Sequence, residues 1–303
     1  ILECGREHRE TLLFFPCTAE PVWAFADTIA VLSQRWHIFQ VVFDGHQPEY
    51  PGDFTSVEQT VDEVTQYLNV HGISHLDAAY GCSLGGACLT RLLALGEISV
   101  GRAIIDGGMT PYRLPFLVRK LLLARDVLSF RTVASNREVL EAAFPPERFT
   151  PPGHDSRKEY NAMERYLKTF SNRTIRNIFW SANNYALPKV PAECGTKITY
   201  WYGCDEKKDR RYNIRFMKHY FPQIRVHGIP KMAHAELVLV HPELFEGRMA
   251  GVFVETQGAV TLGKTVTDLQ SDKKFGVQNA LVLLHLDREK FMQILKDCIR
   301  TLP

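Results

Sequence analysis

The sequence predicts an α/β fold, in which helices flank a mostly parallel sheet, with a helical insertion and a C-terminal α+β appendage. Two observations support this prediction. Short apolar runs rich in β-forming residues alternate with longer runs of helical periodicity in the first part of the chain, and the alternation resumes near residue 197. At 303 residues the chain is long enough for one large domain with a small appendage. We therefore divide it into a core (1–108 and 190–250), an insertion (109–189) and a tail (251–303).

The core elements follow in order. The first expected strand, 11–15, has the sequence TLLFF and is apolar from residue 12 on, which is typical of a buried strand. The segment 56–70 places Val57, Val61 and Val64 at helical spacing. Further strands are expected at 37–43, 76–80, 102–105, 197–202 and 224–229, and further helices at 23–33, 84–95, 211–219 and 235–248.

The insertion interrupts this alternation. We expect it to be mostly helical, with an apolar and basic helix over 113–129, Pro- and Gly-rich breaks near 145–153 and another helix near 158–169. The first helix resembles in composition those that lie on a membrane surface, but we favour a helix with one face toward a pocket. No stretch of the chain approaches the ~20 apolar residues needed to cross a bilayer, so stable membrane insertion is not expected.

Composition and charge narrow the functional classes. The chain carries 36 basic and 34 acidic side chains, and this near balance gives no reason to expect a nucleic-acid partner. Its seven cysteines are scattered without a C-x-x-C pair, which disfavours a disulfide framework or a zinc site. The first ten residues are too charged for a signal peptide. A reducing cytoplasm fits these features best.

The strongest motif joins an expected strand to an expected helix. The strand at 76–80 runs directly into GCSLG, a G-x-S-x-G sequence centred on Ser83. A serine on so sharp a turn adopts a strained conformation that exposes its hydroxyl, and its neighbours come too close for side chains, which explains Gly81 and Gly85. The helix that starts at Leu84 directs its positive dipole end toward the reacting centre. Ser83 is therefore the predicted nucleophile.

A serine hydroxyl is a poor nucleophile and needs an oriented base. Of the eleven histidines, His234 has the best position, because it lies in a loop directly after the last expected strand of the core. His241 precedes Pro242 within the next helix, where packing or capping is the more natural role, and His227 lies within a strand. We therefore assign His234 as the base.

The third member of a catalytic triad is an acid that holds the imidazole tautomer and stabilises the imidazolium ion. It is expected at the end of the strand before the histidine loop, where Asp205 and Glu206 both follow Gly203. The residues alone do not separate these two carboxylates. Asp106, after an earlier strand, is a weaker third candidate.

An oxyanion hole needs two backbone N–H groups aimed at the developing charge. Leu84 directly follows the nucleophile and is expected to supply one of them. The other is expected from the loop after the first core strand, where Cys17 is the assigned donor.

Residues from about 11 to 248 resemble the α/β-hydrolase superfamily. The resemblance rests on the turn at 81–86, the Asp44-Gly45-His46 turn after the second core strand, the acid loop after Tyr202, and His234 followed by His241-Pro242-Glu243. It implies that the acid stands three residues after the loop glycine, which favours Glu206 over Asp205. It also implies that the insertion is a cap that roofs the active site. The short N-terminal region departs from the pattern, because it leaves little room for the two leading strands of many members.

The tail carries two patterns that point elsewhere. Residues 258–265 match the phosphate-binding sequence G-x-x-x-x-G-K-[ST] and include Lys264. A working loop needs a strand before it and a helix after it. A strand is expected at 251–256, but 265–269 alternate like a second strand, so we expect no nucleotide binding.

The whole tail, 251–303, resembles the C-terminal end of nucleoside hydrolases, yet the chain shows nothing like their aspartate cluster. We interpret it as a β-hairpin followed by a strand–helix unit. Its apolar faces are expected to be buried either on the core or against a second copy of the chain, and in the second case the chain would form a homo-oligomer.

Together these features predict a serine hydrolase that cleaves a carboxylic ester or a related acyl bond of a small molecule through an acyl-serine intermediate. This chemistry requires no metal or organic cofactor. Two alternatives stay open. The same triad could serve another acyl-transfer or C–C bond reaction, or the chain could be a small-molecule binding protein that keeps the triad and turns over little.

Overall fold

The computed structural model describes residues 1–50, 52–112, 114–193 and 195–254. Their centre is a seven-stranded sheet in the order β1-β3-β2-β4-β5-β6-β7, in which only β1 runs antiparallel to its neighbour. The strands are β1 (Leu2–Cys4), β2 (Thr11–Phe15), β3 (His37–Gln40), β4 (His75–Cys82), β5 (Ser99–Asp106), β6 (Lys197–Gly203) and β7 (Arg225–Ile229). The predicted mostly parallel α/β sheet is confirmed.

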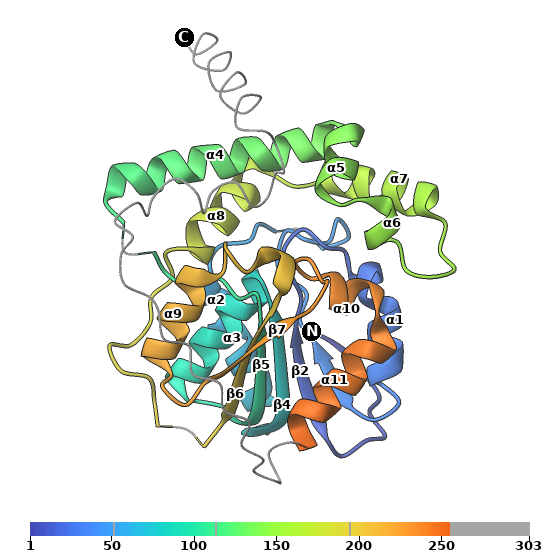
Figure 1. The fold of residues 1–303 in the computed structure, drawn as a ribbon. Coiled ribbons are helices and arrows are strands. Elements are labelled where there is room, and N and C mark those ends of the chain that lie inside the picture. The colour runs from blue at the N-terminus through green and yellow to red at the C-terminus, as the bar shows by residue number, and fades with distance from the viewer. Residues whose placement is uncertain (51, 113, 194, 255–303) are drawn as a thin grey trace.

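Helices cover both faces of this sheet (Figure 1). One face carries α2 (Val57–Val70), α3 (Leu84–Leu95) and α9 (Arg211–Tyr220), and the other carries α1 (Ala26–Leu32), α10 (Glu236–Val240) and α11 (Pro242–Val254). Successive side chains of a strand point to opposite faces, so Leu13 and Phe15 of β2 pack under the first group while Leu12 and Phe14 pack under the second. Both faces of β2 are therefore buried, and this explains why residues 12–15 are all apolar.

Two expectations near the end of the core were wrong. The helix expected at 235–248 is two helices, interrupted at His241, because a residue before proline is disfavoured in the helical conformation. The strand expected at 251–256 is helical up to Val254, where α11 ends. Phe245 and Met249 of α11 are buried and Val252 packs against the same core, so helical spacing prevails there over strand alternation. Residues 255–303, with the sequence 258–265, lie outside the described residues.

The two ends of the sheet also differ in detail from expectation. The edge strand β1 pairs with β3, so one short strand precedes β2, in a region that was expected to leave little room for two leading strands. Three residues give too little periodicity to be found in a sequence. Strand β3 ends at Gln40 rather than at residue 43, although Val41 and Phe43 remain buried.

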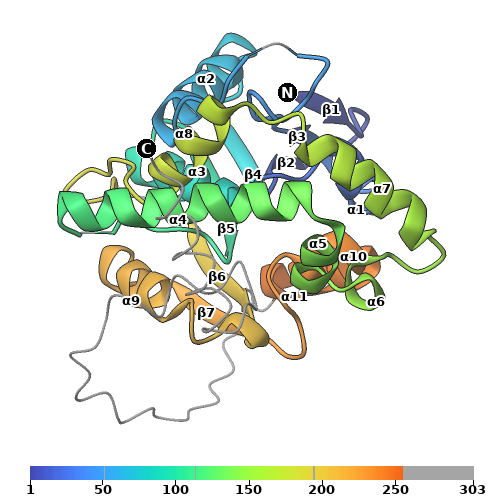
Figure 2. The same cartoon turned by 90° about the horizontal axis from the view of Figure 1, so that it is seen from above.

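The insertion between β5 and β6 is helical and lies above the carboxyl edge of the sheet (Figures 1 and 2). The helices of the insertion are α4 (Phe116–Ser135), α5 (Arg137–Ala143), α6 (Pro146–Phe149), α7 (Ser156–Leu167) and α8 (Asn172–Ala182). Seen from above, the long helix α4 crosses over the core (Figure 2). Its Phe116, Leu117 and Leu121 side chains are exposed, so one apolar stripe of the helix faces outward.

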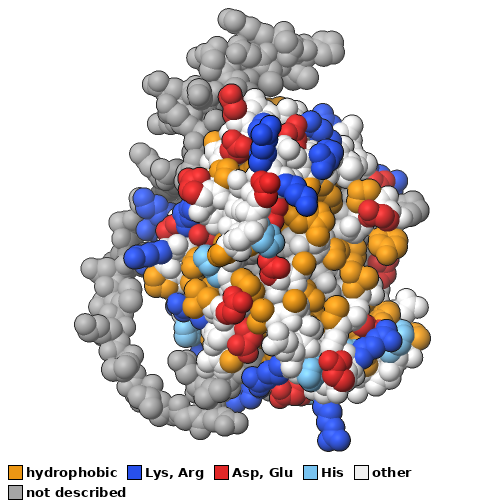
Figure 3. Space-filling model, turned by 90° about the vertical axis from the view of Figure 1, so that its right-hand side faces the viewer, with side chains coloured by type: hydrophobic (Ala, Val, Ile, Leu, Met, Phe, Trp, Pro, Cys, Tyr) orange, Lys and Arg blue, Asp and Glu red, His pale blue; other side chains and the backbone are white. Residues whose placement is uncertain are grey.

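Surface composition is mixed on the side of α1, α10 and α11. On this face acidic, basic and apolar side chains are interspersed, without a large area of one charge (Figure 3). Among the described helices, none is long and apolar enough to cross a membrane.

A close backbone approach at Gly85 gives the first prediction. A Cβ at this position would lie 2.4 Å from the Pro16 carbonyl oxygen and 2.5 Å from that of Phe15, so Gly85→Ala forces the start of α3 away from the loop after β2. We expect it to lower the free energy of unfolding by about 2 kcal/mol, measured by urea denaturation.

Gly247→Ala is the matched control. Gly247 lies within α11 and a Cβ there would meet nothing within 4 Å, so this change should raise the free energy of unfolding by about 0.5–1 kcal/mol. A Gly85→Ala variant as stable as the parent would contradict the described packing.

Candidate active site

Ser83 stands on a strained turn between β4 and α3. Its φ of 55° and ψ of −111° are a backbone conformation that side chains other than glycine rarely adopt. Three hydrogen bonds stabilise this conformation. The Ser83 N–H donates to the Asp106 carbonyl (2.9 Å), and the Ser83 carbonyl accepts from the N–H groups of Ala87 (3.1 Å) and Met109 (3.2 Å). The turn therefore has the geometry that the G-x-S-x-G sequence predicts for an exposed nucleophile.

His234 and Glu206 meet beside this turn. Nδ1 of His234 lies 2.9 Å from Oε2 of Glu206, and the Gly203 N–H donates to Oε1 of the same carboxylate (3.2 Å). Gly107 has a φ of +55°, and a Cβ there would lie 2.6 Å from Cε1 of His234. Since Met109 in the same loop bonds to Ser83, the short segment after β5 contacts both the serine and the histidine.

The structure separates the three candidate acids. Glu206 is 4% exposed and, among the described residues, is the candidate whose carboxylate contacts His234. Asp205 is half-exposed and pairs instead with Arg148, Nη2 to Oδ2 at 2.9 Å. Asp106 is buried and accepts a hydrogen bond from the Tyr80 hydroxyl (2.7 Å). The geometry therefore favours Glu206 as the partner of the imidazole.

Burial and neighbouring charges set the ionisation of two of these acids. Burial raises the pKa of Glu206, but the positive Arg210 and the contact with His234 outweigh it and bring the pKa to about 2. Burial raises the pKa of Asp106 to about 6, with the nearby Glu206 charge acting in the same direction. Glu206 is therefore the carboxylate that is fully ionised at neutral pH in this cluster.

Arg210 is a member of the site that the sequence interpretation missed. It is buried at the start of α9, and its Nε donates to Oε2 of Glu206 at 2.6 Å. Its Nη2 also lies 3.1 Å from Nδ1 of His234. Glu206 and Arg210 are spaced i,i+4, which is typical of ion pairs on helices. The sequence of this segment nevertheless predicts a charged loop, because every residue from 205 to 211 is charged.

A second arginine ties the insertion to the histidine loop. Arg148 of α6 donates from Nε to Oε1 of Glu236 (3.2 Å) and from Nη2 to Oε2 of the same residue. The same Nη2 lies 3.3 Å from the Lys231 carbonyl, and Glu236 accepts from the Ala233 N–H (2.7 Å). A residue of the insertion thus holds the loop on both sides of His234.

The two assigned oxyanion donors lie at the same edge of the sheet. Leu84 is the first residue of α3, so its N–H has no acceptor within the helix. Cys17 follows β2 and is buried, and the Pro16 carbonyl before it closely approaches Gly85. His46 connects this loop to the turn after β3, with Nε2 3.1 Å from the Thr18 hydroxyl.

Two cavities border these elements. One, with about 10 Å³ of free space, lies beside the loop after β2, where Pro16, Glu20 and His46 line it. Burial raises the pKa of Glu20 to about 8, so this carboxyl is mostly protonated at neutral pH. Its neighbour His46 is kept neutral, because burial lowers its pKa to about 4.

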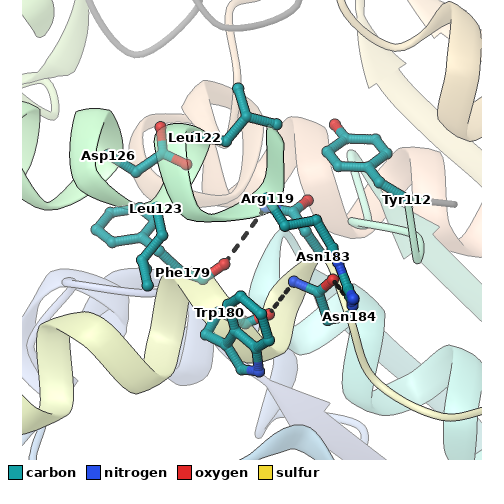
Figure 4. Close-up of a pocket in the computed structure, with 9 residues that line it drawn as sticks. All are labelled: Tyr112, Arg119, Leu122, Leu123, Asp126, Phe179, Trp180, Asn183 and Asn184. Carbon is teal, nitrogen blue, oxygen red and sulfur yellow. Dashed lines mark hydrogen bonds between the residues drawn. The ribbon is translucent and has the colours of Figure 1, made fainter. Parts of the chain in front are cut away.

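The other cavity, also with about 10 Å³ of free space, lies within the insertion between α4 and α8 (Figure 4). Its lining includes Tyr112, Arg119, Trp180 and Asn183. The Arg119 Nε and the Asn183 Oδ1 are buried without a hydrogen-bond partner. An unpaired donor and an unpaired acceptor at one cavity can bind a small polar group.

The chain is similar in fold to several solved structures. An α/β-hydrolase family protein from Desulfitobacterium hafniense has a TM-score of 0.63 at 16% identity, over 83% of this chain and 99% of that one. A carboxylesterase of Nitrososphaera gargenis has 0.60 at 14%, over 84% and 94%. The enol-lactonase from Burkholderia xenovorans LB400 has 0.58 at 15%, over 82% and 94%. No protein-family model and no curated protein matches the sequence.

The lowered pKa of Glu206 gives a prediction about stability. A folded-state pKa of about 2, below the ordinary 4.5, stabilises the folded state above pH 4.5, and this stability is lost as the pH falls toward 2. Glu206→Gln should have a lower free energy of unfolding than the parent at pH 5. This difference should shrink by about 3 kcal/mol between pH 5 and pH 2. Urea denaturation at several pH values measures it.

Asp205→Asn is the control for this series. Asp205 is half-exposed, so its replacement should change the free energy of unfolding little at any of these pH values. A deficit of Glu206→Gln that stays constant from pH 5 to pH 2 would rule out an ionised, charge-paired Glu206.

Proposed function

We propose that this chain, which has the α/β-hydrolase fold, is a serine hydrolase that cleaves a carboxylic ester or a related acyl bond of a small molecule. The observation that supports it best is the contact between His234 Nδ1 and the buried, ionised Glu206, next to Ser83 on its strained turn. A serine, an imidazole and a carboxylate in this order along a chain and around one edge of a sheet suit nucleophilic acyl transfer.

Each residue has a defined role in the proposed reaction. A proton on Nδ1 of His234 points to Glu206, which leaves the Nε2 lone pair to accept the Ser83 hydroxyl proton. The serine oxygen then attacks the acyl carbonyl, and the N–H groups of Leu84 and Cys17 bind the resulting oxyanion. His234 returns its proton to the departing alcohol. Water, activated by the same imidazole, attacks the acyl-serine and releases the acid.

The insertion is proposed to act as the cap that shapes the substrate pocket. It lies over the carboxyl edge of the sheet where Ser83 and Glu206 stand (Figure 1). The cavity beside Glu20 adjoins the proposed oxyanion loop and the cavity at Arg119 lies in the insertion, but each has space for about one water molecule, so they do not define a substrate pocket. An ester bond as the target is supported by the carboxylesterase and the enol-lactonase among the similar structures, since both names denote cleavage of an acyl–oxygen bond.

A second candidate function rests on one specific observation. Among the described residues Ser83 and His234 form no hydrogen bond with each other, although His234 contacts Glu206 and Arg210. A small-molecule binding protein that keeps the triad without turnover would show this arrangement. Catalytic hydrogen bonds are often long in the absence of substrate and tighten when it binds, so we prefer the hydrolase.

The nucleophile is tested by labelling and by turnover. Treatment with a fluorophosphonate should modify Ser83, identified by peptide mass spectrometry. Ser83→Ala should lose this labelling and lower kcat on an activated acyl ester by about 10³-fold or more, because no acyl-enzyme can form. Circular dichroism reports whether the variant keeps the fold.

Activity of Ser83→Ala within tenfold of the parent would disprove the assignment. A parent chain that binds acyl esters but neither reacts with the probe nor turns over would establish the binding protein instead.

The acid is tested by a pair of isosteric changes. Glu206→Gln removes the charge that stabilises the imidazolium ion and should lower kcat on the order of 10³-fold. Asp205→Asn, one residue away, should have a much smaller effect because its carboxylate faces Arg148. Initial rates with saturating ester measure both, and a larger loss from Asp205→Asn would transfer the role to that residue. If neither change lowers the rate, Asp106 becomes the candidate.

A further inference from the structure

All three nitrogens of one buried guanidinium contact residues of the proposed site. Arg210 is 7% exposed, and its Nε donates to Oε2 of Glu206 at 2.6 Å. Its Nη2 lies 3.1 Å from Nδ1 of His234, and its Nη1 lies 3.1 Å from the sulfur of Met109, the residue whose N–H bonds to Ser83. Arg210 therefore touches the acid, the base and the loop that supports the nucleophile.

The position of Arg210 is set by the backbone as well as by its charge. Its N–H donates to the Glu206 carbonyl at 3.1 Å, and its own carbonyl accepts from the Ile214 N–H at 2.8 Å. The acid and the arginine thus stand on one continuous run of turns that leads into α9. Taking a guanidinium out of water is costly, and an ionised carboxylate beside it offsets that cost. Backbone hydrogen bonds and the ion pair together therefore hold Glu206 and Arg210 in place.

Two groups compete for the same nitrogen of the imidazole. Oε2 of Glu206 lies 2.9 Å from Nδ1 of His234, and Nη2 of Arg210 lies 3.1 Å from it. A guanidinium only donates hydrogen bonds, so Nδ1 either donates to Glu206 or accepts from Arg210. The first tautomer leaves Nε2 free to act as a base. The second puts the proton on Nε2 and removes the base.

We propose that Arg210 is a positioning residue of the triad. It holds Oε2 of Glu206 in place as the acceptor for Nδ1–H of His234, and its permanent positive charge beside the ring disfavours a second proton on the resting imidazole. This inference rests on the proposed function of the same site.

Other charged groups also surround the imidazole. Glu206 faces the His234 ring from the loop after β6, and the Asp106 carboxyl at the end of β5 interacts with the charge of His234. Glu236 of α10 anchors the histidine loop through the Ala233 N–H. These groups are carboxyls, which favour a positively charged ring. Among these neighbours Arg210 opposes protonation, so its removal should shift the pH dependence in one direction.

The test uses the rate at which a fluorophosphonate labels Ser83 in the full chain, measured from pH 5 to pH 9. In Arg210→Met the rate at pH 7 should fall about tenfold or more. The midpoint of its acid limb should rise on the order of one pH unit, because a permanent cation no longer opposes protonation of the base. Arg210→Lys keeps the charge and should keep the parent midpoint, while its rate falls because the bond to Oε2 is not reproduced.

Arg211→Met is the matched control, since it removes a neighbouring cation from an exposed position. It should leave both the rate and the midpoint unchanged. An Arg210→Met chain with the parent midpoint, or an Arg211→Met chain with an equal shift, would overturn the proposal. A parent chain that is not labelled at all would instead refute the proposed function.

A measurement on the unmodified chain covers the case in which Arg210→Met does not fold. Nitrogen-15 NMR of histidine side chains assigns the proton to Nδ1 or Nε2. In the neutral ring of His234 we expect the proton on Nδ1. A proton on Nε2 would mean that Nδ1 accepts from Arg210, and the proposed positioning role would then be wrong.

Discussion

The strained backbone of Ser83 is the constraint on which the rest of the site depends. A conformation of this kind costs about 1–3 kcal/mol and persists only where the surroundings determine it. Here two of the three stabilising hydrogen bonds come from Asp106, the last residue of β5, and from Met109, in the segment that follows it. That segment also includes Gly107, which packs against the ring of His234. The position of the serine is therefore fixed by the same residues that fix the histidine.

Charge pairing away from solvent is the second feature of the site. A buried ion pair such as Glu206–Arg210 adds little net stability, because both ions lose their hydration. Well-packed apolar residues of similar size would serve the fold as well. The ion pair instead keeps the Glu206 carboxylate ionised and holds it in a fixed direction next to the imidazole of His234. Asp106, at the end of the neighbouring strand β5, has a raised pKa instead, because burial outweighs the effect of the nearby positive charges.

Much of this fold, and part of the site, could be predicted from the sequence. The apolar strands and the Ser83 turn were recognisable because their signals are local, a run of a few residues or a fixed spacing of glycines. The family resemblance favoured Glu206 over Asp205, but the residues alone did not separate them, because this needs the direction of side chains on a short turn. Arg210 was missed because a charged residue in a charged loop is most often solvated. It is buried here only because α9 and the loop after β5 close over it.

The contact of Arg148 with the histidine loop bears on how this chain could be recombined with others. Enzymes of new specificity are often sought by grafting one inserted segment onto another core. In this molecule α6 is part of the support of residues 231–236, through Glu236 and the Lys231 carbonyl. A graft that omitted an arginine at this place would leave Glu236 buried without its cation. The borders of a transferable module therefore do not coincide with the borders of the insertion in the chain, and a chimera has to carry both partners of this contact together.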